Sequence, residues 1–504
     1  MTNASRPNIL MIMYDQLTPS MLGCYGGPAI APTIDRLASE GVTFDAAYTN
    51  SPLCTPARYC MMTGRLPSST KGYDNAAYLA STIPTFAHVA RRAGYRTVLS
   101  GKMHFVGPDQ LHGFESRRTT DIYPADFGWT PDWRAPLERI DWWYHNMDSV
   151  TGAGIAEVTN QLLFDDETGH HAVRALHDVV RSDDQDPFLV VASFTHPHDP
   201  YVTRHRYWDR YEGVAIPMPE IGRSDVVDDP HSTRLRAAVN EHTVTITDHH
   251  VRSARRAYLG NISYVDEWTE RLVRSLDDLG VADNTVVLLV ADHGDMLGER
   301  GLWYKMNFFE GSARIPLVVH APEQFEPRRV ACPVSLVDVL PTICELIGAD
   351  VSDLTDPPAG QSLVRLCEGA VEDREVIGEY MAEGSISPIV MIRRGDYKFV
   401  HCRNDPDQLY DLRSDPHELR NLALEPGSSG VMSAMRATVE QRWDLDVLEQ
   451  DVLDDQARRR FITEALRQGE YTPWDFTPTT NGGSQYMRNH LDLNDVERTA
   501  RWPR

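Results

Sequence analysis

A cysteine, a proline and an arginine follow one another closely in the segment CTPAR at residues 54–58. Proline is favoured in the first turn of a helix, so Pro56 predicts that a helix begins here and that Cys54 lies just ahead of it. The positive end of that helix would attract an anion, and Arg58, about one turn further on, would stabilise an oxygen that gains negative charge. The segment indicates a site where Cys54 acts on an anionic group. The alternative is a buried cysteine beside a helix that starts with proline.

Polar residues also follow four predicted strands, at residues 8–13, 96–100, 188–194 and 285–291. The run at 8–13 is mainly apolar, which is typical of a strand covered on both faces of a parallel sheet. Helices are expected at 32–38 and 84–92, and a further strand at 42–48. Because ligands of such sheets bind beyond the carboxyl ends of the strands, we expect these clusters to converge on one crevice: Asp15-Gln16, Lys102 with His104, His196 with His198, and Asp292-His293. For any one cluster alone, a solvated strand end is the alternative.

The pattern changes after a predicted helix at 336–347 and a loop-like stretch at 350–375. Short strands joined by turns are expected at 376–380, 389–393 and 397–401, followed by a helical stretch at about 432–468. We therefore predict an α/β fold, with a large and mostly parallel sheet sandwiched by helices and a smaller C-terminal α+β domain. The predicted divisions are a catalytic domain at 1–375, the smaller domain at 376–470 and a tail at 471–504.

Composition narrows the classes of partner. The chain of 504 residues carries 49 Lys and Arg against 73 Asp and Glu, a net charge of -24 that repels nucleic acid and favours a zwitterionic or cationic ligand over an anionic one. Seven cysteines with no Cys-x-x-Cys pair argue against a disulfide framework or a thiolate zinc site. No apolar run reaches the length needed to span a membrane, and no secretory signal is recognisable, so a soluble cytoplasmic protein is expected.

The segment at 54–58, continued by Thr63-Gly64-Arg65, resembles the signature of the sulfatase family, the formylglycine-dependent type I branch of the alkaline phosphatase superfamily. The resemblance covers nearly the whole chain, including the segments at 409–412 and 415–422 in the predicted second domain. It implies that a formylglycine-generating maturation system oxidises Cys54 to formylglycine. It also implies hydrolysis of sulfate esters through a sulfo-enzyme intermediate, with one divalent cation in the site.

By this resemblance the cation is held by Asp15, Gln16, Asp292, His293 and the modified Cys54. The commonest family pattern has Asp and Asn as second members of the two pairs. Gln16 and His293 instead resemble the branch of choline-sulfatases and phosphonate monoester hydrolases. Oxygen ligands suit Ca²⁺, Mg²⁺ or Mn²⁺, and an imidazole moves the preference towards Mn²⁺. Calcium is the expected ion, and its identity stays open.

The resemblance also implies roles for the other clusters. Arg58, Lys102 and Lys305 hold the sulfuryl oxygens together with the cation, and His198 or Lys305 protonates the departing alcohol. His104 removes a proton from the second hydroxyl of the hydrated formylglycine, which expels sulfate, whereas His196 only supports His198.

Narrower segments, at 73–77, 101–114, 120–129, 139–147 and 471–493, resemble the choline-sulfatase branch in particular and imply choline O-sulfate as the substrate. A trimethylammonium group has no hydrogen-bond donor at nitrogen, so aromatic faces and a carboxylate are expected to recognise it. The candidates are Trp129, Trp142, Trp143 and Glu383, with Asn75, His145 and Asn146 nearby. The alternative for the tryptophans is an ordinary place in the core.

Two other functions stay open at this point. One is a phosphonate monoester or phosphodiester hydrolase, or a broader arylsulfatase, of the same superfamily. The other is a non-enzymatic binder of an osmolyte or anion that lacks the modification.

The tail at 471–504 has several aromatic residues, and its prolines and glycines prevent a long helix. It therefore packs on its own subunit or, as the resemblance implies, joins a homo-oligomer, expected to be a tetramer, with Asp492 or Asp495 near the ammonium of a neighbour.

Overall fold

The computed structural model describes residues 6–138, 145–182 and 186–469. Its largest sheet has eight strands in the order β12-β2-β11-β9-β1-β7-β4-β5. Five neighbouring pairs in it run parallel, and only the two pairs made by β11 run antiparallel. The predicted fold class, a large and mostly parallel sheet between helices, is confirmed. The strands are β1 (Asn8–Asp15), β2 (Val42–Phe44), β4 (Arg96–Gly101), β5 (Ser116–Arg117), β7 (Phe188–Pro197), β9 (Thr285–Ala291), β11 (Leu317–His320) and β12 (Arg328–Val330).

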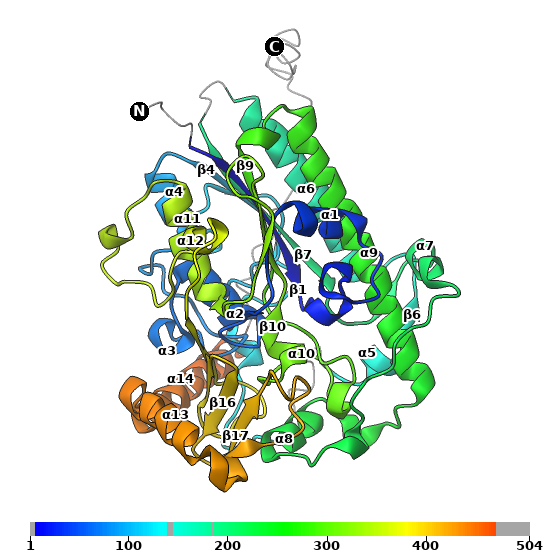
Figure 1. The fold of residues 1–504 in the computed structure, drawn as a ribbon, viewed down its shortest axis with the longest axis vertical. Coiled ribbons are helices and arrows are strands. Elements are labelled where there is room, and N and C mark those ends of the chain that lie inside the picture. Colours follow the sequence, from blue (N-terminus) through cyan, green and yellow to red (C-terminus); the bar gives the residue numbers. More distant parts are fainter. Residues whose placement is uncertain (1–5, 139–144, 183–185, 470–504) are drawn as a thin grey trace.

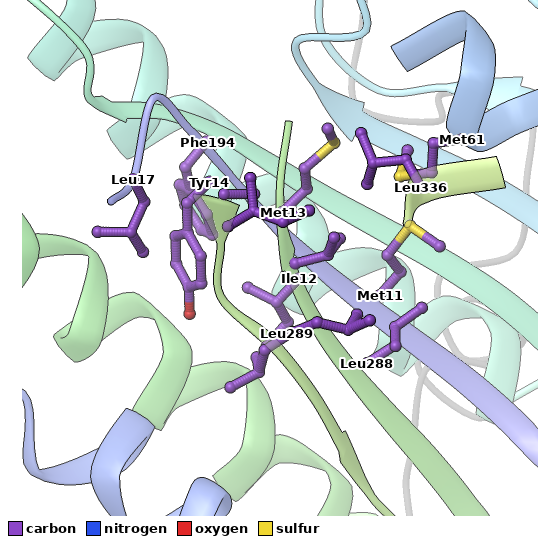
Figure 2. Close-up of a cluster of buried hydrophobic side chains, with 14 of the residues drawn as sticks. Met11, Ile12, Met13, Tyr14, Leu17, Met61, Phe194, Leu288, Leu289 and Leu336 are labelled. Carbon is purple, nitrogen blue, oxygen red and sulfur yellow. The ribbon is translucent and has the colours of Figure 1, made fainter. Parts of the chain in front are cut away.

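Strand β1 lies in the middle of the sheet, with every residue buried. Successive side chains of a strand point to opposite faces, so an all-apolar run suits a strand with cover on both sides. Figure 2 shows Met11 and Met13 on the side where Met61 lies, while Tyr14 points the other way. The hydroxyl of Tyr14 reaches Thr269 at 2.6 Å.

Helices cover both faces of this sheet (Figure 1). Two long helices, α6 (Asn160–Val180) and α9 (Asp248–Asp278), lie on one face and pack against β7. On the other face lie α2 (Cys54–Thr63), α4 (Phe86–Arg92) and α11 (Val339–Leu346), which pack against one another. The remaining helices outside the C-terminal region are short: α1 (Pro32–Glu40), α3 (Pro67–Thr70), α5 (Asp148–Thr151), α7 (His205–Trp208), α8 (Pro230–Ala238), α10 (Glu310–Ala313) and α12 (Val364–Cys367).

The four predicted strands of the parallel core, β1, β4, β7 and β9, are neighbours in the sheet and share one direction. Their carboxyl ends therefore open on the same edge, as the sequence predicted. The polar residues that follow each strand leave the sheet at this edge, which is where the site described below is built.

The predicted second region is also present. Its sheet is antiparallel, in the order β14-β15-β16-β17, with strands β14 (Glu375–Tyr380), β15 (Ile389–Arg394), β16 (Tyr397–Cys402) and β17 (Asp405–Asp411). Helix α13 (Ser429–Arg442) packs on it through Met432, Met435 and Val439. Helix α14 (Leu445–Leu466) follows. The limits of the domains stay a prediction, although this sheet begins at Glu375, next to the expected boundary.

Three local expectations differ from the structure. The strand expected at 42–48 divides into β2 and β3 (Ala47–Tyr48), and β3 belongs to a separate sheet with β10 (Arg314–Ile315) and β13 (Val334–Ser335). The helix expected at about 432–468 breaks into α13 and α14. Strand β17 was not expected at all. A two-stranded sheet of β6 (Gly154–Ile155) and β8 (Val202–Thr203) completes the described strands.

Two expectations about chain class can be examined in the described residues. None of the helices there has the length and apolarity required to cross a membrane. All seven cysteines lie in the described part of the chain, and each is a free thiol. The tail at 471–504 and the candidates Trp142 and Trp143 lie outside the described residues.

Candidate active site

Four residues that could ligate a metal meet at the carboxyl edge of the sheet. Asp15 ends β1, Asp292 and His293 follow β9, and Cys54 is the first residue of α2. One ligand atom from each lies within 4.8 Å of the others, and all four residues are buried. The Cys54 sulfur is 3.3 Å from His293 Nε2 and 3.7 Å from Asp15 Oδ1. The structure thus brings together four of the five residues that the sequence predicted for the cation.

The imidazole of His293 presents a lone pair to this cluster. Its Nδ1 lies 3.0 Å from the carbonyl oxygen of Gly294, which can only accept, so Nδ1 carries the proton and Nε2 does not. Nε2 then faces Asp292 Oδ1 at 3.6 Å and Asp15 Oδ1 at 3.8 Å. Burial, reinforced by the charge of Lys305, holds the pKa of His293 well below its usual range. A neutral imidazole, two carboxylates and a sulfur around one point fit a divalent cation.

The two carboxylates are in different electrostatic situations. Burial disfavours the ionised form of Asp15, but the positive charges of Lys102 and Arg58 outweigh burial and keep the pKa of Asp15 well below its ordinary value. Burial and the charge of Asp15 together raise the pKa of Asp292. A cation bound between the two carboxylates would relieve this repulsion, which is a second reason why the cluster suits a metal.

Arg58 joins the two halves of the cluster. It is fully buried, and its Nε and Nη2 donate to Asp292 Oδ2 and Asp15 Oδ2, each at 2.9 Å. Its Nη1 donates to the carbonyl oxygen of Lys102 at 2.6 Å and to Ser193 Oγ at 3.0 Å. The guanidinium therefore orients both carboxylates and ties the ends of β4 and β7 to them.

Lys102 lies directly after β4 with its ammonium inside the site. Its Nζ forms an ion pair with Asp15 Oδ2, and both side chains are fully buried. The same Nζ lies 4.2 Å from the ring centre of Tyr123. Burial lowers the pKa of Lys102, but Asp15 and the Cys54 sulfur outweigh this and raise it, so the ammonium stays charged.

A lysine and a histidine form a second pair beside the cluster. Lys305 Nζ is 2.9 Å from His198 Nε2, while His198 Nδ1 is 2.6 Å from the carbonyl oxygen of Asp199. Because that carbonyl accepts, Nδ1 carries the proton and Nε2 accepts from the lysine. Burial, then the charge of Lys305, keeps the pKa of His198 well below its usual range, so the ring is neutral and its Nε2 is an acceptor. His196, by contrast, bonds Asp165 at 2.7 Å and supports the end of β7.

Gln16 is the fifth predicted ligand, and its side chain makes other contacts here. Its Nε2 donates to Asp295 Oδ2 at 2.7 Å and to Asp199 Oδ1 at 3.3 Å, and its Oε1 accepts from Lys305 Nζ at 2.5 Å. The two carboxylates fix the amide so that its oxygen faces Lys305. Ligation of the cation by Gln16 stays a prediction.

His104 occupies a strained position at the rim. Its φ of 59° is in the left-handed region, and its backbone N–H donates to Asp121 Oδ2 at 2.7 Å. The ring is buried, and neither ring nitrogen has a hydrogen-bond partner among the described residues. Burial, then the charge of Lys102, holds its pKa well below the usual range. The neutral ring is therefore able to accept a proton.

Left-handed backbone recurs around the site. Gln16, Tyr304 and Met306 have φ angles of 64°, 66° and 76°. Such angles are costly for residues other than glycine and turn side chains sharply out of the regular path of the chain. They flank Asp15 and Lys305, so the local strain coincides with the residues that carry charge.

The residues predicted for the ammonium pocket lie on several loops beyond the carboxyl edge of the large sheet. The ring of Trp129 is 6.0 Å from the ring of His104 and 5.4 Å from that of Tyr123. The ring of His145 lies 5.0 Å from that of His198. Asn75 accepts the Thr55 N–H at 3.0 Å through its Oδ1. Asn146 caps a turn with its side chain, which accepts from the N–H of Asp148 at 2.9 Å.

Glu383 stands apart from the other carboxylates. It is only 6% exposed, and neither of its carboxyl oxygens has a hydrogen-bond partner among the described residues. Burial, followed by the charge of Asp74, raises its pKa to about 8, although Lys305 and Arg459 act in the opposite direction. A buried acid without a partner is costly unless a cation compensates it.

Several side chains of the site were not predicted. Tyr123 underlies Lys102 and contacts His198 Nδ1 at 3.2 Å, Asp199 and Asp295 orient Gln16, and Asp121 holds the backbone of His104. Asp199 directly follows His198 and Asp295 follows Gly294, so both could have been read from the same strand-end clusters. Tyr123 and Asp121 lie in a loop whose residue types indicate no chemistry by themselves, and the resemblance of the segment at 120–129 was the available signal.

Comparison with known proteins agrees with this architecture. The family model described as Sulfatase matches residues 7–349, more than half of the chain. Two further models match the C-terminal part: one for the C-terminal region of N-sulphoglucosamine sulphohydrolase, at residues 298–444, and one for the C-terminal region of choline sulfatase enzymes, at residues 450–502. The chain belongs to the sulfatase family.

Within the family, the chain is 49% identical to a choline-sulfatase of Rhizobium meliloti, over 99% of both chains. It is 27% identical to an arylsulfatase of Clostridium perfringens, over 83% of this chain and 90% of that one. Among solved structures, a phosphonate monoester hydrolase of Agrobacterium radiobacter aligns with a TM-score of 0.68 and 22% identity, covering 89% of this chain and 96% of that one. The last likeness shows the shared fold alone.

Proposed function

We propose that this protein hydrolyses choline O-sulfate to choline and inorganic sulfate, with Cys54 as the precursor of its nucleophile. The observation that carries the proposal is the meeting of Cys54 with two carboxylates, a neutral imidazole and Lys102 at the positive end of α2. The similarity to a choline-sulfatase over 99% of the chain supports the choice of substrate.

The cation would be held by Asp15, Asp292, His293 and the modified Cys54, and by Gln16 once Lys305 releases the amide oxygen. When bound, the cation and the formylglycine made from Cys54 would supply an acidified hydroxyl for attack on sulfur. Calcium is the proposed ion because hard oxygen donors dominate this set, and elemental analysis would distinguish it from Mn²⁺ and Mg²⁺.

Side chains of the chain itself hold the sulfuryl group. Lys102 and Lys305 bring two ammonium groups to the cluster, and Arg58 fixes the carboxylates beneath them. These donors are buried and already oriented, so little reorganisation accompanies the growth of negative charge on the sulfuryl oxygens.

The proton for the departing choline oxygen comes from the Lys305–His198 pair. Lys305 donates to His198 Nε2 in the resting enzyme, and His198 is anchored by Asp199 through Nδ1. A leaving oxygen that enters between the two side chains would receive this proton. The pair also explains why the sequence could not choose between the two residues as the acid.

His104 is proposed as the base that acts at the Cys54 position when sulfate departs. Its carbonyl oxygen lies 3.4 Å from Thr55 Oγ1, so the residue borders the start of α2. A neutral ring with no partner among the described residues is free to accept a proton there.

The trimethylammonium group would lie against Trp129 and near Glu383, with Asn75 and His145 completing the wall. An aromatic face attracts a cation that cannot form hydrogen bonds, and Glu383 supplies the compensating charge. Asn146 would act through its backbone, whose carbonyl oxygen accepts from Tyr304 at 2.6 Å.

Three parts of the proposal concern the protein in its cell. We propose a cytoplasmic enzyme, a formylglycine-generating system that acts on Cys54, and a homotetramer in which the tail at 471–504 reaches a neighbouring subunit. Deleting residues 471–504 should lower the mass measured by light scattering and raise the KM for choline O-sulfate. An unchanged mass would make the tail an appendage of its own subunit.

A substrate panel tests the main proposal. Enzyme with fully modified Cys54 and a full complement of metal is assayed for release from choline O-sulfate, an aryl sulfate and a phenyl phosphonate monoester. We expect the highest kcat/KM for choline O-sulfate. A higher value for the phosphonate ester would assign the site to phosphonate chemistry, and tight binding without turnover by protein from its native host would assign it to a binding protein.

A further inference from the structure

Arg459, a buried arginine of helix α14, forms hydrogen bonds to a loop of the predicted catalytic domain. Arg459 is 3% exposed and Asp74 is fully buried. The guanidinium nitrogens Nη1 and Nη2 donate to Asp74 Oδ1 and Oδ2 at 2.7 and 2.8 Å, which is a forked, two-point contact. Nη1 also donates to Thr130 Oγ1 at 3.1 Å, and Nε donates to Asp455 of the same helix at 2.8 Å.

Both partners of Arg459 adjoin residues of the proposed ammonium pocket. Asp74 precedes Asn75, and Thr130 follows Trp129. One arginine side chain therefore holds the ends of two separate loops, each of which carries one wall of the pocket. Asn75 in turn accepts the Thr55 N–H, so the same contact extends to the first turn of α2 beside Cys54.

The neighbouring turn of α14 reaches the third wall. Gln456, which is fully buried, accepts the N–H of Trp133 at 3.2 Å through its Oε1. The indole of Trp133 donates to the carbonyl oxygen of Ala382 at 3.0 Å, next to Glu383. Tyr73, Trp133 and Met381 form one apolar cluster with Leu448 and Val452 of α14. The helix thus packs behind all three loops.

The charges are arranged consistently with this role. After burial, the charge of Asp74 is the main influence that raises the pKa of Glu383, and Arg459 opposes it. Because the guanidinium compensates Asp74, the carboxyl of Glu383 is the acid of the pocket that stays without a partner among the described residues. A substrate cation would then be directed to Glu383 rather than to Asp74.

We propose that Arg459 is a positioning residue that sets the selectivity of the enzyme for a cationic alcohol, by holding Asn75 and Trp129 in place through Asp74 and Thr130. This inference rests on the proposed function. It assigns a role to the part of α14 that lies within the match to the C-terminal region of choline sulfatase enzymes. Arg459 touches neither the cluster around Cys54 nor the Lys305–His198 pair by any described contact.

The test compares two substrates of the same shape. Choline O-sulfate and its isostere 3,3-dimethylbutyl sulfate differ only in the terminal group, which is a charged trimethylammonium in the first and an uncharged tert-butyl group in the second. In Arg459→Met we expect the KM for choline O-sulfate to rise about tenfold, which is the size of a lost cation–aromatic contact, with kcat changed by less than about threefold. The kcat/KM for the isostere should change by less than about threefold as well.

Three further variants keep the test interpretable. Arg458→Met removes the exposed arginine next in sequence and should leave both substrates unchanged. Arg459→Lys keeps the charge but loses the fork, so it should restore part of the lost selectivity. Asp74→Asn combined with Arg459→Met removes both charges, which avoids a lone buried carboxylate and keeps the protein folded if the single variant is unstable.

The outcomes separate the inference from the function on which it rests. If the wild-type enzyme does not hydrolyse choline O-sulfate, the proposed function fails. If it does, and the folded double variant keeps the wild-type KM for choline O-sulfate, Arg459 has no part in selectivity. Equal losses on both esters in a folded variant would likewise overturn the proposal, because they would show a purely structural helix contact.

Discussion

The edge of the sheet that holds Cys54 and the loops that hold Trp129 and Glu383 differ in how their charged side chains are paired. At the sheet edge the two carboxylates of the cluster are paired with buried cations: Arg58 bridges Asp15 and Asp292, and Lys102 pairs with Asp15. In the loops, Glu383 is buried with no hydrogen-bond partner among the described residues. The first region holds its charges in oriented ion pairs around the place of the metal ion, whereas the second presents a buried acid that a cationic group of the substrate would compensate.

This contrast supports the proposed placement of the two halves of the substrate. A preorganised set of paired charges stabilises charge that develops during a reaction, which suits the sulfuryl group. An acid without a partner gains most from a ligand that brings a positive charge, which suits a quaternary ammonium. Changes at the sheet edge should therefore affect all sulfate esters equally, and changes in the loops should affect only the cationic one.

The largest effect is expected from Cys54→Ala. Loss of the nucleophile precursor should lower kcat for every sulfate ester by at least about 10⁴-fold, as removal of a nucleophile does in other hydrolases. The measurement is initial rate at saturating substrate, with mass spectrometry of the peptide that contains residue 54. Cys60→Ala is the matched control, since Cys60 is a buried cysteine of the same helix. Substantial turnover by Cys54→Ala would remove Cys54 from the mechanism.

Asp292→Asn should come next. The variant loses one of the charges that would hold the cation, so metal affinity should fall by more than about 100-fold, beyond the loss usual for an outer partner of a ligand. Elemental analysis after dialysis and the rise in Tm on adding metal report this independently of activity. Asp266→Asn is the control, because Asp266 is a buried carboxylate that caps α1 instead. Unchanged metal content in Asp292→Asn would contradict the ligand set.

A smaller and selective effect is expected at Trp129 and Glu383. In Trp129→Ala and in Glu383→Gln, kcat/KM for choline O-sulfate should fall about 2- to 30-fold, which corresponds to the loss of about 0.5–2 kcal/mol of cation binding. The kcat/KM for 3,3-dimethylbutyl sulfate should change little. Parallel losses on both esters would place these residues in sulfuryl transfer or in folding.

The smallest effect is a pH dependence of KM. The pKa of Glu383 is raised to about 8, so in the free enzyme at pH 7 the carboxyl is mainly protonated. A cationic substrate prefers the ionised form and releases the proton, so KM for choline O-sulfate should fall as pH rises towards 8 and level off above it. The isostere should lack this trend, as should Glu383→Gln. A pH-independent KM for choline O-sulfate would show that Glu383 does not meet the ammonium.

The sequence predicts the sheet-edge region well for a physical reason. Strands β1, β7 and β9 are buried on both faces, so most of their length is apolar and polar residues stand at their ends, while β4 has a shorter apolar centre at Val98 and Leu99. Where such strands are parallel, their ends must share an edge. The convergence of Asp15, Lys102, His198 and Asp292 follows from topology before any side chain is placed.

The strands that the sequence did not predict correctly are defined by their pairing with distant strands. The run at 42–48 is divided because β2 pairs with β11 and β12 while β3 pairs with β10 and β13, a choice that local pattern does not encode. Strand β17 contains Pro406 and lies at the edge of its sheet, where proline is tolerated, so its pairing with β16 rather than its composition defines it. The break between α13 and α14 had a readable signal, since Asp444 caps α14 by accepting the N–H of Val447.

The supporting acids of the site were only partly readable. Asp199 and Asp295 stand in the strand-end clusters, but their bonds to the Gln16 amide form only once distant segments meet, and Asp121 bonds the backbone of His104 from a loop. The Arg459–Asp74 pair is the extreme case, because its members are 385 positions apart in sequence. Charge compensation between buried groups cannot be read from spacing alone.

The most direct test of the division between the two regions is the ratio of kcat/KM for choline O-sulfate to that for 3,3-dimethylbutyl sulfate in the wild-type enzyme, measured with fully modified Cys54. If the sheet edge binds the sulfuryl group and Glu383 meets the ammonium, kcat/KM should be about tenfold or more higher for choline O-sulfate, mainly through a lower KM. Equal kcat/KM for the two esters would show that the loops do not recognise charge and would contradict the account.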